Sequence, residues 1–128
     1  MAKYLRYESS TGPRYGLLKG EAITPLQGQF PDLTVTDEAE IALEDVKLLA
    51  PVQPTRIVSC GPGFKCSFPD PSMYPDKPMF WHKPLVALNH PEGIIELPDS
   101  EYPGVNHEAE LGIVIGRTAK CVSPEEAG

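Results

Sequence analysis

Near the end of this chain lies the run His107-Glu108-Ala109-Glu110-Leu111-Gly112-Ile113-Val114-Ile115-Gly116, in which two acidic residues lead directly into an apolar, β-branched stretch. Such residues favour strands, and side chains two positions apart in a strand point to the same side. Glu108 and Glu110 are therefore predicted to lie side by side at the start of a strand. Residues 111–115 carry no polar side chain, which predicts that this strand is buried on both faces.

The acidic pair allows two interpretations. Glutamates at alternate positions are typical of the solvated face of an antiparallel edge strand. In a buried strand, by contrast, two neighbouring carboxylates repel each other unless a cation lies between them. Carboxylate oxygens favour a hard cation such as Mg²⁺ or Mn²⁺. Because the apolar run that follows predicts burial, the pair indicates a metal site at Glu108 and Glu110.

The composition restricts the class of protein. The chain has 128 residues, of which 41% are hydrophobic, as expected for an ordinary globular protein. No run approaches the roughly 18 apolar residues of a membrane span, and the first residues lack the apolar core of a signal peptide, so we expect a cytosolic protein. The net charge of −7 argues against nucleic acid or an anionic membrane as partner.

Cysteine, proline and glycine give two further indications. The three cysteines, Cys60, Cys66 and Cys121, are odd in number and show no CxxC spacing, so neither a disulfide framework nor a zinc site is indicated. Fifteen prolines and eleven glycines divide the chain into short extended pieces. This pattern predicts a β-rich fold.

The positions of the prolines, glycines and other turn-forming residues also predict how the chain is organised. Strand-like alternation is found at residues 3–7, 14–18 and 22–24, and clusters of turn-forming residues separate these segments. The pattern predicts a meander of antiparallel strands. A proline-rich connector at 51–54 separates this small β unit, residues 1–50, from a second unit at 51–128. Further short strands are predicted at residues 56–60, 79–83 and 94–98.

The end of the sequence has the features of a helix start. Ser123 is a preferred capping residue, Pro124 suits the first helical position, and two glutamates follow in the first turn. A helix this short cannot offset its nucleation cost, so we expect that the chain is cut short of its natural domain.

Several motifs together resemble one known family. They are Tyr4-Leu5-Arg6-Tyr7, Arg14-Tyr15-Gly16, Leu48-Leu49-Ala50-Pro51-Val52, Ile57-Val58, Lys83-Pro84 and, most specifically, His107-Glu108-Ala109-Glu110-Leu111 with Ile115-Gly116-Arg117. The chain resembles the N-terminal portion of a fumarylacetoacetate hydrolase family protein. The resemblance implies a mainly β, β-rich α+β fold, with a small antiparallel β domain at 1–50. The incomplete first part of the family's mixed β-roll catalytic domain would follow at 51–128.

The resemblance also implies roles for individual residues. Glu108 and Glu110 match the two glutamates that bind Mg²⁺ or Mn²⁺ in the family, where a later aspartate completes the set. Lys83 matches a lysine close to the substrate's carboxylate or carbonyl, a role that suits a compact positive charge. The family's catalytic His and Glu dyad is replaced here by Ser67 and Asp70, catalytic positions without an imidazole. Phe64 replaces a tyrosine and is expected to bind substrate.

The function that the resemblance implies is metal-dependent chemistry of the hydrolase or decarboxylase type, or an isomerisation. The substrate would be a small anionic 2-oxo acid or 1,3-dicarbonyl acid, cleaved at a C–C bond through a metal-stabilised enolate. The expected assembly is a homodimer. The alternative is a truncated or degenerate, non-catalytic member that acts as an interaction protein, because the dyad is replaced and the third metal ligand is absent from the sequence.

Overall fold

The structure is a computed structural model that describes residues 2–64, 66, 68–97, 99 and 104–127. The chain divides into two units, Met1–Gly93 and Ile94–Gly128. The domain bounds 1–50 and 51–128 stay a prediction.

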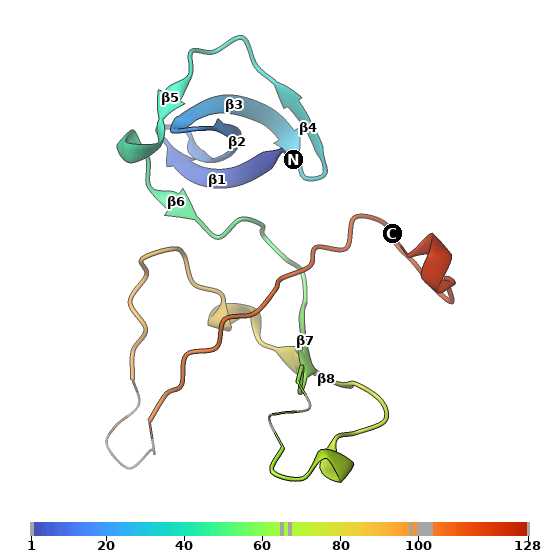
Figure 1. Ribbon diagram of the computed structural model, residues 1–128. Coiled ribbons are helices and arrows are strands. Elements are labelled where there is room, and N and C mark those ends of the chain that lie inside the picture. Colours follow the sequence, from blue (N-terminus) through green and yellow to red (C-terminus); the bar gives the residue numbers. More distant parts are fainter. Residues whose placement is uncertain (1, 65, 67, 98, 100–103, 128) are drawn as a thin grey trace. The chain divides into compact units, whose positions relative to one another are not determined.

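The first unit begins with an antiparallel sheet whose strands follow the spatial order β4-β3-β2-β1-β6, with β5 also paired to β3 (Figure 1). The strands are β1 (Lys3–Ser9), β2 (Gly12–Lys19), β3 (Ala22–Gln29), β4 (Asp32–Val35), β5 (Ile41–Ala42) and β6 (Leu48–Leu49). Lys19 pairs with Ala22, so β2 and β3 are joined by a two-residue turn, and Gly20 there has φ +61°, as tight hairpins require. The predicted meander is confirmed, and the three strands are longer than expected.

The core of this sheet is formed by the inward side chains of β1, β3 and the end of β6. The buried apolar residues are Tyr7, Ile23, Leu26, Leu49 and Ala50. Gly16 on β2 belongs to the same packing, because a Cβ at this position would collide with the Cγ2 methyl of Ile23. The glycine therefore gives the largest core side chains the space that they fill.

A charged pair ties the connection after β4 to the sheet. Arg14 donates from both terminal guanidinium nitrogens to the two carboxylate oxygens of Glu38, each at 2.7 Å. The hydrogen bond from Arg14 lowers the pKa of Glu38, and the same bond raises the pKa of Arg14. Two residues further on, Glu40 accepts a hydrogen bond of 3.0 Å from the Thr24 hydroxyl.

The first unit continues into a two-stranded antiparallel sheet, β7 (Ile57–Gly61) with β8 (Met79–Lys83). The strands predicted at 56–60 and 79–83 are thus confirmed, the first shifted by one residue. The indole of Trp81 lies against Gly61, since a Cβ there would be 3.0 Å from the ring. After β8 come the one-turn 3-10 helix η4 (Leu85–Ala87) and His90, whose Nδ1 accepts a 3.0 Å hydrogen bond from the Ala50 amide.

The second unit departs from the prediction. The strands expected at 94–98 and 108–115 are wrong, because the structure has no strand at 94–97 or at 108–115, and residue 98 lies outside the described residues. The expected burial is also wrong: Leu111, Ile113 and Ile115 are 89%, 78% and 77% exposed. A β-branched run becomes a strand only where a neighbouring strand pairs with its backbone, and no strand in the described ranges pairs with this one.

The helix start at the end of the sequence is confirmed as a single turn. Pro124–Glu126 form the 3-10 helix η5, and the Ser123 amide donates to the Glu126 carboxylate at 3.1 Å. This bond is one half of a capping box. Among the helices that the structure describes, none is long and apolar enough to cross a membrane.

Candidate functional site

The first part of the predicted site lies in the connection between β7 and β8. Phe64 is 73% exposed. Asp70 is also exposed and precedes the 3-10 helix η3 (Pro71–Met73), where its carboxylate accepts a 2.8 Å hydrogen bond from the Ser72 amide. This bond lowers the pKa of Asp70. Ser67, the other predicted catalytic residue in this segment, lies outside the described residues.

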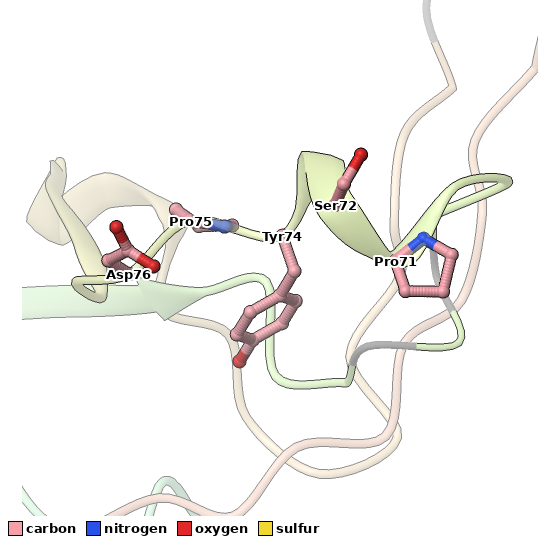
Figure 2. Close-up of a pocket in the computed structure, with 5 residues that line it drawn as sticks. All are labelled: Pro71, Ser72, Tyr74, Pro75 and Asp76. Atoms are coloured by element: carbon pink, nitrogen blue, oxygen red, sulfur yellow. The ribbon is translucent and has the colours of Figure 1, made fainter.

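Tyr74 organises this connection, and the sequence prediction missed it. Its hydroxyl donates to the Pro62 carbonyl oxygen at 3.2 Å, and its ring meets Phe68 edge to face, with centroids 5.8 Å apart and planes at 83°. In Figure 2 the ring of Tyr74 and the side chain of Ser72 point in opposite directions from η3. An aromatic residue in a proline-rich segment was the only signal in the sequence, and it did not identify this role.

An open hollow lies beside η3, lined by Pro71, Ser72, Tyr74, Pro75 and Asp76 (Figure 2). Among the predicted site residues that the structure describes, none lines it. Binding sites for small molecules are usually enclosed, apolar pockets with a few converging polar groups, whereas this hollow is open and bordered by prolines. We therefore do not assign it as the substrate site.

Lys83 lies at the far end of the β7–β8 sheet from the loop that carries Phe64. It pairs with Ile57, whereas Gly61, where the loop begins, pairs with Met79. Four residue steps at about 3.3 Å each place Lys83 roughly 13 Å along the strand from the base of the loop. The side chain is exposed, as are its neighbours on β8. The structure therefore does not bring Lys83 to the base of this loop.

Glu108 and Glu110 belong to the second unit. Both side chains are exposed, and the backbone from 104 to 116 runs without turn or bend. Two carboxylates are the right kind of donor for a hard divalent cation, but Mg²⁺ takes six ligands, so the pair can supply only part of the coordination. Within the described ranges, no group of three or more His, Cys, Asp or Glu side chains is placed to hold a metal ion.

Comparison with known proteins identifies the class. Residues 2–51 match the family model described as Rv2993c-like, N-terminal, and residues 63–128 match the model described as fumarylacetoacetate (FAA) hydrolase C-terminal. The second match covers more than half of the chain, including both glutamates and Lys83. This chain belongs to the fumarylacetoacetate hydrolase family, which confirms the resemblance expected from the sequence motifs.

Three curated relatives illustrate the relationship. The chain is 29% identical over 138 aligned positions to 2,4-didehydro-3-deoxy-L-rhamnonate hydrolase of Sphingomonas sp. (strain SKA58), an alignment that covers 98% of this chain and 48% of the relative. It is 44% identical over 57 residues to caffeoylpyruvate hydrolase of Neonothopanus nambi, covering 41% of this chain and 20% of that protein. Protein Rv2993c of Mycobacterium tuberculosis is 36% identical over 86 residues, with 66% of this chain and 32% of the relative covered.

The alignments thus span less than half the length of each of these relatives. No solved structure matches the chain.

Proposed function

We propose that this chain provides the metal-binding segment of a hydrolase that cleaves a C–C bond in a small 2-oxo acid or 1,3-dicarbonyl acid. The observation that carries the proposal is the match of residues 63–128 to the FAA hydrolase C-terminal family, because this range contains the acidic pair. Two relatives bear hydrolase names. Caffeoylpyruvate is by name an acyl derivative of pyruvate, which is a 2-oxo acid, and supports this substrate class.

Glu108 and Glu110 are the residues that would hold the divalent cation, Mg²⁺ or Mn²⁺. When bound, such an ion polarises carbonyl oxygens as a Lewis acid. The two side chains are exposed and acidic, and the donor type fits a hard cation. Further ligands would have to come from water, from substrate oxygens or from other protein groups.

Lys83 would bind the anionic end of the substrate. Its ammonium group is a compact charge on a flexible stem, which suits a carboxylate. The exposed ring of Phe64 would contact the acyl end of an acylpyruvate.

Asp70 has a restricted role in this scheme. An exposed aspartate is ionised near neutral pH in any case, and the hydrogen bond from the Ser72 amide lowers the pKa of Asp70 further, which makes the carboxylate a weak base for activating water. It can accept a hydrogen bond from water and orient it. Since decarboxylation needs less base chemistry than hydrolysis, the state of Asp70 also favours a second candidate, a 2-oxo acid decarboxylase.

The test is turnover of caffeoylpyruvate by the chain with Mn²⁺. We expect Glu108→Gln and Glu110→Gln each to lower turnover at least tenfold, because each removes a charged ligand without changing its size. Glu96→Gln, an exposed glutamate outside the pair, is the matched control and should keep full turnover. Absence of turnover in the unmodified chain would favour the non-catalytic interaction protein, and unchanged turnover in both variants of the pair would refute the metal role.

We also propose that the chain pairs with a second copy. Large apolar side chains at Ile94, Ile95 and Leu97 are 87%, 72% and 70% exposed, and Leu111, Ile113 and Ile115 are exposed to a similar degree. Exposed apolar surface of this kind favours association. Size-exclusion chromatography should give twice the mass of the 14.0 kDa chain, and a compact monomer would contradict the pairing.

A further inference from the structure

The connection between β7 and β8 presents two candidate site residues without the support of a strand. Phe64 and Asp70 are both exposed, and neither lies in a helix or strand. A side chain that binds substrate must nevertheless be held near one position, because loose placement lowers affinity. The question is which contacts fix these two residues.

Tyr74 makes two contacts that answer this question. Its hydroxyl donates to the carbonyl oxygen of Pro62, two residues before Phe64, at 3.2 Å. Its ring packs edge to face on Phe68, two residues before Asp70, with centroids 5.8 Å apart. Tyr74, Pro62 and Phe68 are all partly buried, unlike the two residues that they flank. One side chain therefore joins both parts of the connection.

The backbone of Tyr74 is hydrogen-bonded to η3. The Tyr74 amide donates to the Pro71 carbonyl oxygen at 3.2 Å, and the same helix receives the carboxylate of Asp70 through the Ser72 amide at 2.8 Å. Asp70, η3 and Tyr74 are thus linked by consecutive hydrogen bonds. The backbone of Tyr74 and the carboxylate of Asp70 are therefore both attached to η3.

The Pro62 side is also supported. Pro62 follows Gly61, the last residue of β7, which pairs with Met79 and lies under the indole of Trp81. The Tyr74 hydroxyl therefore bonds to a carbonyl directly after a strand end that is covered by a large ring. This arrangement gives the hydroxyl a fixed acceptor.

We propose that Tyr74 is a positioning residue that holds Phe64 and Asp70 in place for the substrate. The inference rests on the proposed function, since the two residues act on substrate only if the chain binds an oxo acid. Tyr74 itself contacts no reacting atom. It acts through the Pro62 carbonyl and the Phe68 ring.

Two variants test the hydrogen bond to Pro62 and the ring contact with Phe68 separately, and a third variant serves as the control. Tyr74→Phe removes the hydroxyl and keeps the ring, whereas Phe68→Leu removes the edge-to-face contact and keeps apolar volume. Tyr4→Phe removes a hydroxyl from a tyrosine on β1 that is 53% exposed, outside the machinery. All three are made in the full chain.

The first measurement is steady-state turnover of caffeoylpyruvate with Mn²⁺. Loss of one hydrogen bond that orients a binding residue should raise KM about fivefold in Tyr74→Phe and leave kcat within about twofold. A purely structural role would instead lower the amount of active protein, which reduces the apparent kcat at constant KM. Tyr4→Phe should match the unmodified chain in both parameters.

The second measurement is limited proteolysis with chymotrypsin, which cleaves after aromatic residues and does not depend on activity. Cleavage after Phe64 should become about fivefold faster in Tyr74→Phe and should also increase in Phe68→Leu, because proteolysis follows the population of the open loop. Equal cleavage in Tyr74→Phe and the unmodified chain would overturn the inference. So would faster cleavage with an unchanged KM.

Turnover and proteolysis together distinguish failure of the proposed function from failure of the role proposed for Tyr74. If the unmodified chain turns over no substrate while Tyr74→Phe opens the loop, the proposed function fails and the structural hold of Tyr74 on Phe64 stands. If turnover occurs and depends on Glu108 but not on Tyr74, the proposed function stands and this inference fails.

Discussion

Replacing Tyr7 by phenylalanine is expected to stabilise the N-terminal sheet. Tyr7 is 1% exposed on β1, where it pairs with Arg14 on β2 and Leu48 on β6. Within the described part of the chain, its hydroxyl is buried and has no hydrogen-bond partner. A buried polar group without a partner loses its bonds to water on folding and gains nothing in return.

The size of the effect follows from this burial. An unsatisfied buried donor costs about 1–3 kcal/mol, and removing the oxygen leaves a small void that takes back part of the gain, so we expect a net stabilisation of about 1 kcal/mol. For a domain of this size, that corresponds to a rise in Tm of roughly 4 °C. The Tyr7 ring packs on Gly16 of β2, where a Cβ would be 3.4 Å from Tyr7 Cε1. We expect the phenylalanine ring to keep this contact.

The assay is thermal and urea unfolding of the full chain followed by far-ultraviolet circular dichroism. Tyr15→Phe is the matched control, since Tyr15 is partly exposed on β2 and packs on Phe30 with ring centroids 6.3 Å apart. It should change stability by less than about 0.5 kcal/mol. A Tyr7→Phe chain that is less stable than the unmodified chain would show that the hydroxyl has a partner and would refute the reasoning.

Two further predictions concern the same sheet. The ion pair between Arg14 and Glu38 should contribute its full stability above pH 4.5, the ordinary pKa of the carboxyl group, and should lose it as the pH falls through the lowered pKa of folded Glu38. Unfolding measured at several pH values should show this loss of stability at acid pH. The loss should be smaller in Glu38→Gln. Gly16→Ala should destabilise by about 1–3 kcal/mol in urea unfolding, because the new methyl group would collide with the buried Ile23 side chain.

Each prediction has an outcome that would contradict it. An identical acid dependence in the unmodified chain and in Glu38→Gln would mean that the bidentate pair adds no stability in solution. Gly16→Ala has Gly116→Ala as control, where a Cβ meets open space. Equal stability of the two alanine variants would show that the core beside Gly16 is not tightly packed.

The parts of the fold that sequence reasoning found are those defined by local patterns. Turn clusters around Gly12 and Gly20 separate the strands of the meander, and prolines and glycines mark the ends of β7 and β8. Short strands such as β6 were missed, because Leu48–Leu49 is defined by pairing with β1 rather than by its own pattern. Two residues are too few to show alternation.

The parts that sequence reasoning did not find depend on contacts distant in sequence. The run after Glu110 has the composition of a strand, but strand formation requires a neighbour that pairs with it. Tyr74 was missed for a similar reason, because its partner Pro62 is twelve residues away and the pattern around neither residue indicates the contact. The metal-binding roles proposed for Glu108 and Glu110 rest on the family motif, because the spacing of the two residues alone fits a solvated strand face as well as a metal site.

The proposed function depends on the binding of a divalent cation by Glu108 and Glu110. Titration of the full chain with Mn²⁺, followed by electron paramagnetic resonance of the free ion, tests it most directly. We expect one bound ion per chain and at least tenfold weaker binding in Glu108→Gln and Glu110→Gln, with binding by Glu96→Gln unchanged. No binding by the unmodified chain, or equal binding in all four proteins, would contradict it.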